Sequence, residues 1–120
     1  MRGYDHQEIQ RQRKVAEGEL RNTYYQESSP LKKRIAEIEA ELAKIEPEFK
    51  ELETYFMTPE LYGDANQIKT NTRRHRELQK AIPELSAEWE NLSLEAEQKK
   101  IEFEEAKKDL EAEFARYKAG

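Results

Sequence analysis

The sequence of 120 residues contains no cysteine, and its four glycines, Gly3, Gly18, Gly63 and Gly120, are isolated from one another. The lack of cysteine excludes a disulfide framework and a thiolate metal site, and it agrees with a reducing compartment. No glycine-rich loop is present to wrap a nucleotide phosphate. No apolar run approaches the roughly 20 residues of a membrane-spanning helix, and the polar start does not resemble a signal peptide. We therefore expect a cytoplasmic chain that does not cross a membrane.

Catalytic groups are also scarce. The two histidines, His6 and His75, lie far apart and have no second histidine or cysteine at ligand spacing, so we expect no metal site. No nucleophile can be paired with a general base, and the many glutamates are typical of solvated helix faces. We expect a non-enzymatic chain with no catalytic residue, no metal and no cofactor of its own.

Apolar residues recur at alternating steps of four and three, which is the spacing of a coiled-coil seam. The composition, 36 % hydrophobic and 39 % charged, is too polar for a compact globular core and favours a thin helical body. The first seam contains Leu31, Ile35, Ile38, Leu42, Ile45, Phe49, Leu52 and Phe56. The second contains Ile68, Asn71, His75, Leu78, Ile82, Leu85, Trp89, Leu92, Ala96, Lys99, Phe103, Ala106 and Leu110.

A short connection separates the two seams. Thr58 followed by Pro59 favours a capped short turn, and Gly63 is suited to a left-handed exit. Asp64 and Gln67 have the spacing of a capping box, so the second helix should begin directly after Asp64. A connection this short predicts an antiparallel hairpin that bends near residue 61, formed within one chain as a monomer.

The predicted fold is all-α, an antiparallel two-helix coiled-coil hairpin over residues 30–118. Its arms are residues 30–56 and 65–117, and its loop is residues 57–64. The second arm is the longer one, so we expect residues 1–29, a basic linker and N-terminal helix, to pack along its distal part.

Prolines interrupt the predicted helices at three places. Ser28, Ser29 and Pro30 carry the signals of a helix start, which predicts two helices meeting at a joint. Pro47 and Pro83 fall on outward positions and should kink their helices without breaking them.

Basic residues gather in two zones although the net charge is −5. In the first zone, Lys69, Arg73, Arg76 and Lys80 follow at steps of four, three and four on the outer face, whereas Arg74 flanks the seam. Such a stripe suits a phosphate backbone, and solvated charge without function is the open alternative. Pairing with the acidic first arm is a further alternative, but the register argues partly against it because only Arg74 flanks the second seam. The candidate nucleic-acid-binding residues are Lys69, Arg73, Arg74, Arg76, Lys80, Arg11, Arg13, Lys14, Lys32, Lys33 and Arg34.

The order of parts in residues 11–92 resembles the C-terminal coiled-coil domain of ABC-F family ATPases of the Uup-like kind. Four stretches carry the resemblance: the linker Arg11-Gln12-Arg13-Lys14, the arm start Pro30-Leu31-Lys32-Lys33-Arg34-Ile35, the loop Thr58-Pro59-Glu60-Leu61-Tyr62, and the close Ala87-Glu88-Trp89-Glu90-Asn91-Leu92. The acidic net charge and the continuation over residues 93–120 depart from the family pattern.

The resemblance implies a fragment whose ATPase domains lie upstream on the same polypeptide, with ATP bound there. It implies DNA, or the ribosome and its RNA, as partners. The alternative is a protein–protein interaction or spacer coiled coil that binds no nucleic acid.

Overall fold

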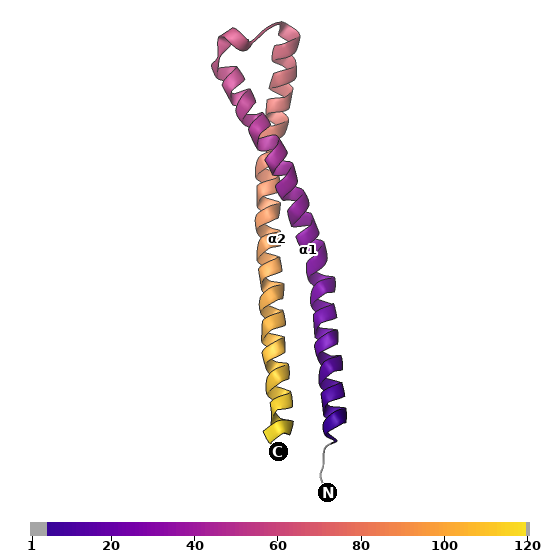
Figure 1. Ribbon diagram of the computed structural model, residues 1–120. Coiled ribbons are helices and arrows are strands. Elements are labelled where there is room, and N and C mark those ends of the chain that lie inside the picture. The colour runs from indigo at the N-terminus through magenta and orange to yellow at the C-terminus, as the bar shows by residue number, and fades with distance from the viewer. Residues whose placement is uncertain (1–4, 120) are drawn as a thin grey trace. The chain divides into compact units, whose positions relative to one another are not determined.

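The computed structural model describes residues 5–119, with the side chains of residues 5–117. Its elements are α1 (His6–Met57), the short 3-10 helix η1 (Pro59–Leu61) and α2 (Ala65–Ala119). The two long helices run in opposite directions on either side of the loop (Figure 1). The fold is therefore the predicted all-α antiparallel hairpin. No helix in the described part of the chain is both long enough and apolar enough to cross a membrane.

The chain divides into two compact units. The loop unit comprises residues 33–93, and the terminal unit comprises residues 1–32 and 94–120. Each unit contains one stretch of α1 and one stretch of α2.

The core of the loop unit is the predicted seam. Ile45, Leu52 and Leu78 form its buried centre. Partly buried neighbours packed against this centre are Leu42, Phe49, Ala81, Ile82 and Leu85. Two seam positions differ from the prediction, because Ile68 and Trp89 are 38 % and 40 % exposed.

The loop is closed by two tyrosines. The Tyr55 hydroxyl donates a hydrogen bond to the Tyr62 carbonyl, and the Tyr62 hydroxyl donates to the Phe56 carbonyl, both at 2.7 Å. The rings of Tyr55 and Tyr62 also pack, with centroids 5.3 Å apart. Their polar tips satisfy carbonyls near the helix end while the rings bury apolar surface.

The start of α2 is as predicted. Gly63 has φ +65°, a left-handed conformation that favours glycine. Asp64 and Gln67 form the capping box: the Gln67 amide donates to Asp64 Oδ1 at 2.8 Å, and the Asp64 amide donates to Gln67 Oε1 at 3.2 Å. Thr58 precedes η1 at the capping position, but its side chain makes no capping bond.

In the terminal unit, the N-terminal part of α1 packs along the distal part of α2, as predicted. Tyr24 stacks on Phe103 with ring centroids 4.5 Å apart, and Lys99 Nζ lies 3.4 Å from a Glu27 carboxylate oxygen. Not every large side chain of this segment takes part in the packing, because Val15 and Tyr25 are exposed.

The predicted joint at Ser28–Pro30 is wrong. α1 passes through these residues without interruption. Proline costs a helix interior about 3 kcal/mol, because one N–H is lost and the ring crowds the preceding turn. Ser28 is buried, so packing holds the helix at this level and overrides the local start signal. The exposed residues Pro47 and Pro83 likewise lie within continuous helices.

We predict that Leu78→Ala lowers the free energy of unfolding by roughly 2–5 kcal/mol, because it leaves a cavity in the centre of the seam. Urea denaturation followed by circular dichroism measures the loss. Leu61→Ala, at an exposed leucine, is the control. Similar losses in both variants would contradict the assignment of the core.

We predict that Ser28→Ala raises the free energy of unfolding by about 1 kcal/mol. The Ser28 hydroxyl is buried and, within the described residues, has no hydrogen-bond partner, so its removal eliminates an unsatisfied polar group. The exposed neighbour Ser29→Ala gains only helix propensity and serves as the control. Equal increases in the free energy of unfolding for Ser28→Ala and Ser29→Ala would show that the higher helix propensity of alanine explains the whole effect.

Candidate nucleic-acid interface

Four cations form a basic stripe on the outer face of α2: Lys69, Arg73, Arg76 and Lys80. All four are exposed. Within residues 5–119, none of them has an ion pair or a side-chain hydrogen bond. The first three line one shallow hollow on the helix surface.

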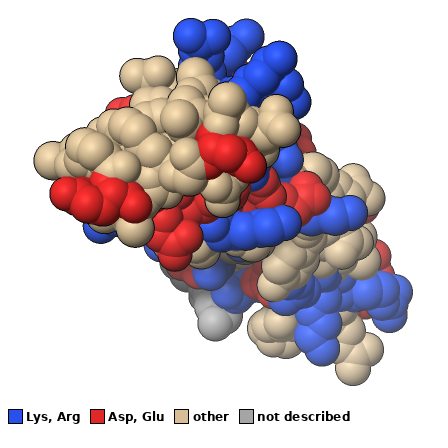
Figure 2. Space-filling view, turned by 90° about the horizontal axis from the view of Figure 1, so that it is seen from above, with Lys and Arg blue, Asp and Glu red and all other residues tan. Residues whose placement is uncertain are grey.

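The helix period explains the stripe. Steps of four, three and four keep the side chains on one face, over about 16 Å of helix axis at roughly 1.5 Å per residue. Neighbouring like charges cost roughly 0.2–0.5 kcal/mol per pair. Glu77 is the one acid among residues 65–80, and it lies 3.2 Å from Arg74. Seen from above, Lys and Arg side chains lie at the upper edge of the view, across its middle and at its lower right, with acidic and uncharged side chains between them (Figure 2).

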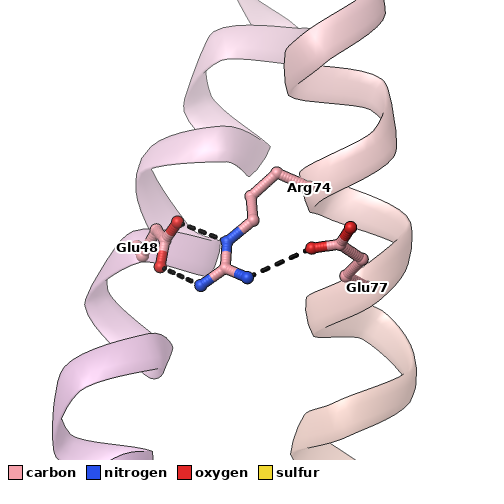
Figure 3. A network of polar contacts seen from close by, with 3 residues as sticks. All are labelled: Glu48, Arg74 and Glu77. Atoms are coloured by element: carbon pink, nitrogen blue, oxygen red, sulfur yellow. Dashed lines mark hydrogen bonds and ion pairs between the residues drawn. The ribbon is translucent and has the colours of Figure 1, made fainter.

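Arg74 has a different role from the stripe. Its Nε and Nη2 donate to the two carboxylate oxygens of Glu48 at 2.6 and 2.9 Å, and its Nη1 donates to Glu77 (Figure 3). The hydrogen bond from Arg74 lowers the pKa of Glu48, against an opposing effect of desolvation. The bond to Glu48, followed by that to Glu77, raises the pKa of Arg74. Arg74 therefore joins α1 to α2, and most of its donor capacity faces protein carboxylates.

Arg34 makes the second bidentate link between the helices. It donates to Glu88 at 2.7 and 2.8 Å, and this bond lowers the pKa of Glu88. Arg34 and Glu88 lie equally far in sequence from residue 61, as do Glu48 and Arg74. Both pairs confirm the predicted centre of the bend.

The remaining candidates of the second basic zone are spread over both units. Arg11 and Arg13 pair within α1, with Glu8 at 2.7 Å and Glu17 at 2.9 Å. Lys32 lies over the Tyr24 ring, 5.3 Å from its centroid. Lys14 and Lys33 are exposed and, among the described residues, make no ion pair. Arg34 and Lys33 belong to the loop unit, and the others belong to the terminal unit.

His75 is a packed seam residue. Its ring stacks on Phe49 with centroids 4.9 Å apart, and Phe56 contacts it edge-on at 5.3 Å. Its Nε2 lies 3.5 Å from Glu53. Within the described part of the chain, no group of three or more potential ligands is arranged to hold a metal ion.

Sequence reasoning missed Glu48 and Glu88 as the partners of Arg74 and Arg34. The predicted bend carried the signal, because residues at equal distances from it face each other across the hairpin. The sequence identified acids beside the first seam in general, without pairing them.

The geometry defines a two-helix hairpin domain with an apolar seam, arginine links between its helices and cations on its outer face. The family model described as ABC transporter C-terminal domain matches residues 26–94, which is more than half of the chain. The chain belongs to this family, which confirms the resemblance to the C-terminal coiled-coil domain of ABC-F proteins. The domain is a helical region of ABC proteins and is not their ATP-binding domain. The searches of curated proteins and of solved structures gave no significant match.

We predict that the arginine links make stability depend on pH at low ionic strength. The pKa values of Glu48 and Glu88 are lowered in the folded state from the ordinary value of 4.5. Each carboxylate therefore contributes fully to the stability of the folded state above pH 4.5, and this contribution is lost as the pH falls through the lowered pKa. Arg34→Gln/Arg74→Gln should therefore lower Tm at neutral pH, and the gap to the wild type should narrow by about pH 3. The gap is small because solvent screens both pairs.

Thermal unfolding by circular dichroism measures both gaps. Arg11→Gln, whose partner Glu8 lies on the same helix, is the control and should show little change in Tm. A gap of the same size at both pH values would contradict the assigned role of the links.

Proposed function

We propose that the chain is the accessory domain through which an ABC-F type ATP-binding protein of the cytoplasm contacts nucleic acid, as DNA or as the RNA of the ribosome. The hairpin domain of residues 30–118 provides the contact without catalysis. ATP is bound by upstream domains of the same polypeptide. The observation that carries the proposal is the basic stripe, whose four cations have no anionic partner among the described residues.

The contrast between the stripe and the other arginines supports this function. Arg74 and Arg34 each hold a carboxylate in bidentate geometry, so the hairpin neutralises cations where it needs a link between helices. The stripe instead keeps four like charges on one face at a cost in free energy. A phosphate backbone relieves that repulsion and releases condensed counterions when it binds.

The chemistry of the stripe favours backbone contacts. Residues 63–88 contain no Phe, Tyr or Trp, so the stripe offers no platform on which unpaired bases stack. Contacts to phosphates position a protein but carry no sequence information. We therefore expect binding to duplex DNA or structured RNA with little dependence on sequence.

We predict that Arg73→Glu/Arg76→Glu weakens binding to labelled duplex DNA or structured RNA by about tenfold or more at low salt. The slope of log affinity against log salt should fall by about two, because two phosphate contacts are lost. Fluorescence anisotropy at several salt concentrations measures both quantities.

The matched control is Lys100→Glu/Lys108→Glu, which makes the same change in net charge at exposed positions of α2 in the terminal unit. This variant should retain more affinity than the stripe variant. Arg74→Gln should change the affinity little, because Arg74 faces Glu48 and Glu77. Equal losses in the stripe variant and the control would show that net charge alone governs binding and would remove the stripe from the site.

The second candidate function is a protein–protein interaction or spacer coiled coil. It is favoured by the exposed apolar residues Met57 and Leu61 at the loop, which are 80 % and 54 % exposed. This function requires no binding to DNA or RNA even at low salt. Both candidates use a monomeric hairpin, in which the seams pair within one chain, and sedimentation tests this state.

A further inference from the structure

Leu94 and Ile101 lie one heptad apart on α2 in the terminal unit, on the side of the helix opposite the seam. They are 66 % and 40 % exposed. At this level the seam side of α2 is already occupied, because Phe103 stacks on Tyr24 and Lys99 pairs with Glu27. Packing between α1 and α2 therefore leaves these two aliphatic side chains without a partner surface.

Three carboxylates surround the aliphatic pair. Glu97 follows Leu94 by three residues and precedes Ile101 by four, while Glu104 and Glu105 follow Ile101 by three and four. Residues at these spacings are neighbours on a helix surface. Within residues 5–119, none of the three acids has an ion pair or a side-chain hydrogen bond. We name Leu94, Glu97, Ile101, Glu104 and Glu105 the acidic–apolar face.

This face is a narrow apolar strip with one apolar residue per heptad, where a full coiled-coil seam has two. A single exposed leucine is ordinary on a protein surface. Two exposed aliphatic residues at heptad spacing offer a helix one contact point per heptad, and charges beside such contacts select the partner. Lys108, one heptad beyond Ile101, ends the apolar run.

We propose that the acidic–apolar face binds a basic amphipathic helix of a partner protein. Apolar residues of that helix pack on Leu94 and Ile101, and its Lys or Arg side chains pair with Glu97, Glu104 and Glu105. Charge decides the occupant, because the three carboxylates outnumber the two lysines at neighbouring spacing, Lys100 and Lys108, so the face repels a phosphate backbone or an anionic lipid surface and attracts cations. This inference goes beyond the proposed function: apart from Leu94, the face lies outside the family match over residues 26–94.

The test uses two labelled synthetic helical peptides of about three heptads, each with one leucine per heptad. One carries lysines beside the leucines and the other carries glutamates. We expect saturable binding of the basic peptide, weakened by salt, and little binding of the acidic one. Leu94→Ser/Ile101→Ser should weaken binding of the basic peptide by about tenfold or more. Val15→Ser/Tyr25→Ser, which removes two exposed side chains from α1 in the same unit, is the matched control and should bind like the wild type.

A charge reversal separates specific docking from general attraction. Glu104→Lys/Glu105→Lys should lose affinity for the basic peptide and gain affinity for the acidic one. The proposal is overturned if both peptides bind the wild type equally, if neither binds, or if Leu94→Ser/Ile101→Ser leaves binding unchanged. Sedimentation could also overturn the proposal. If the wild type associates with itself and Leu94→Ser/Ile101→Ser abolishes the association, the acidic–apolar face binds a second copy of this chain and not a partner protein.

Discussion

The packing of two apolar seams is the interaction on which the rest of the structure depends. Ile45, Leu52 and Leu78 form the buried centre of the loop unit, and few other side chains are fully buried. A two-helix hairpin buries little apolar surface per residue, so each core side chain carries a large share of its stability. The direction in which every other side chain points follows from this seam, including the cations of the outer face.

Much of the fold was predictable from the sequence because its signals are local or periodic. The steps of four and three identified the seams, and Gly63 with Asp64 and Gln67 located the start of α2. The joint at Pro30 was not correctly predicted, because Ser28 and Ser29 resemble a helix start locally while the burial of Ser28, a tertiary effect, decides the outcome. Ile68 and Trp89 occupy heptad positions of the seam and are nevertheless partly exposed. A heptad repeat predicts the direction in which a side chain points, but it does not predict which residues cover that side chain.

For the candidate site, the sequence predicted the helix face on which the cations lie but not their partners. The helix period places Lys69, Arg73 and Arg76 on one face, and the structure leaves them exposed. The sequence did not assign Glu48 to Arg74, because that pairing depends on the register between two helices and on side-chain reach. The two kinds of cation, those that link helices and those that face solvent, are therefore told apart by structure and not by composition.

The position of Arg74 between stripe cations has a mechanical consequence. The interdigitated apolar seam limits both the separation of the two helices and the rotation of either helix about its own axis. The planar guanidinium, held at two points by Glu48, adds a polar contact that opposes the same rotation of α2. Arg73 and Arg76 lie in the same turn of α2 as Arg74. A contact that opposes rotation of this turn therefore also limits the directions in which the positive charges of Arg73 and Arg76 can face.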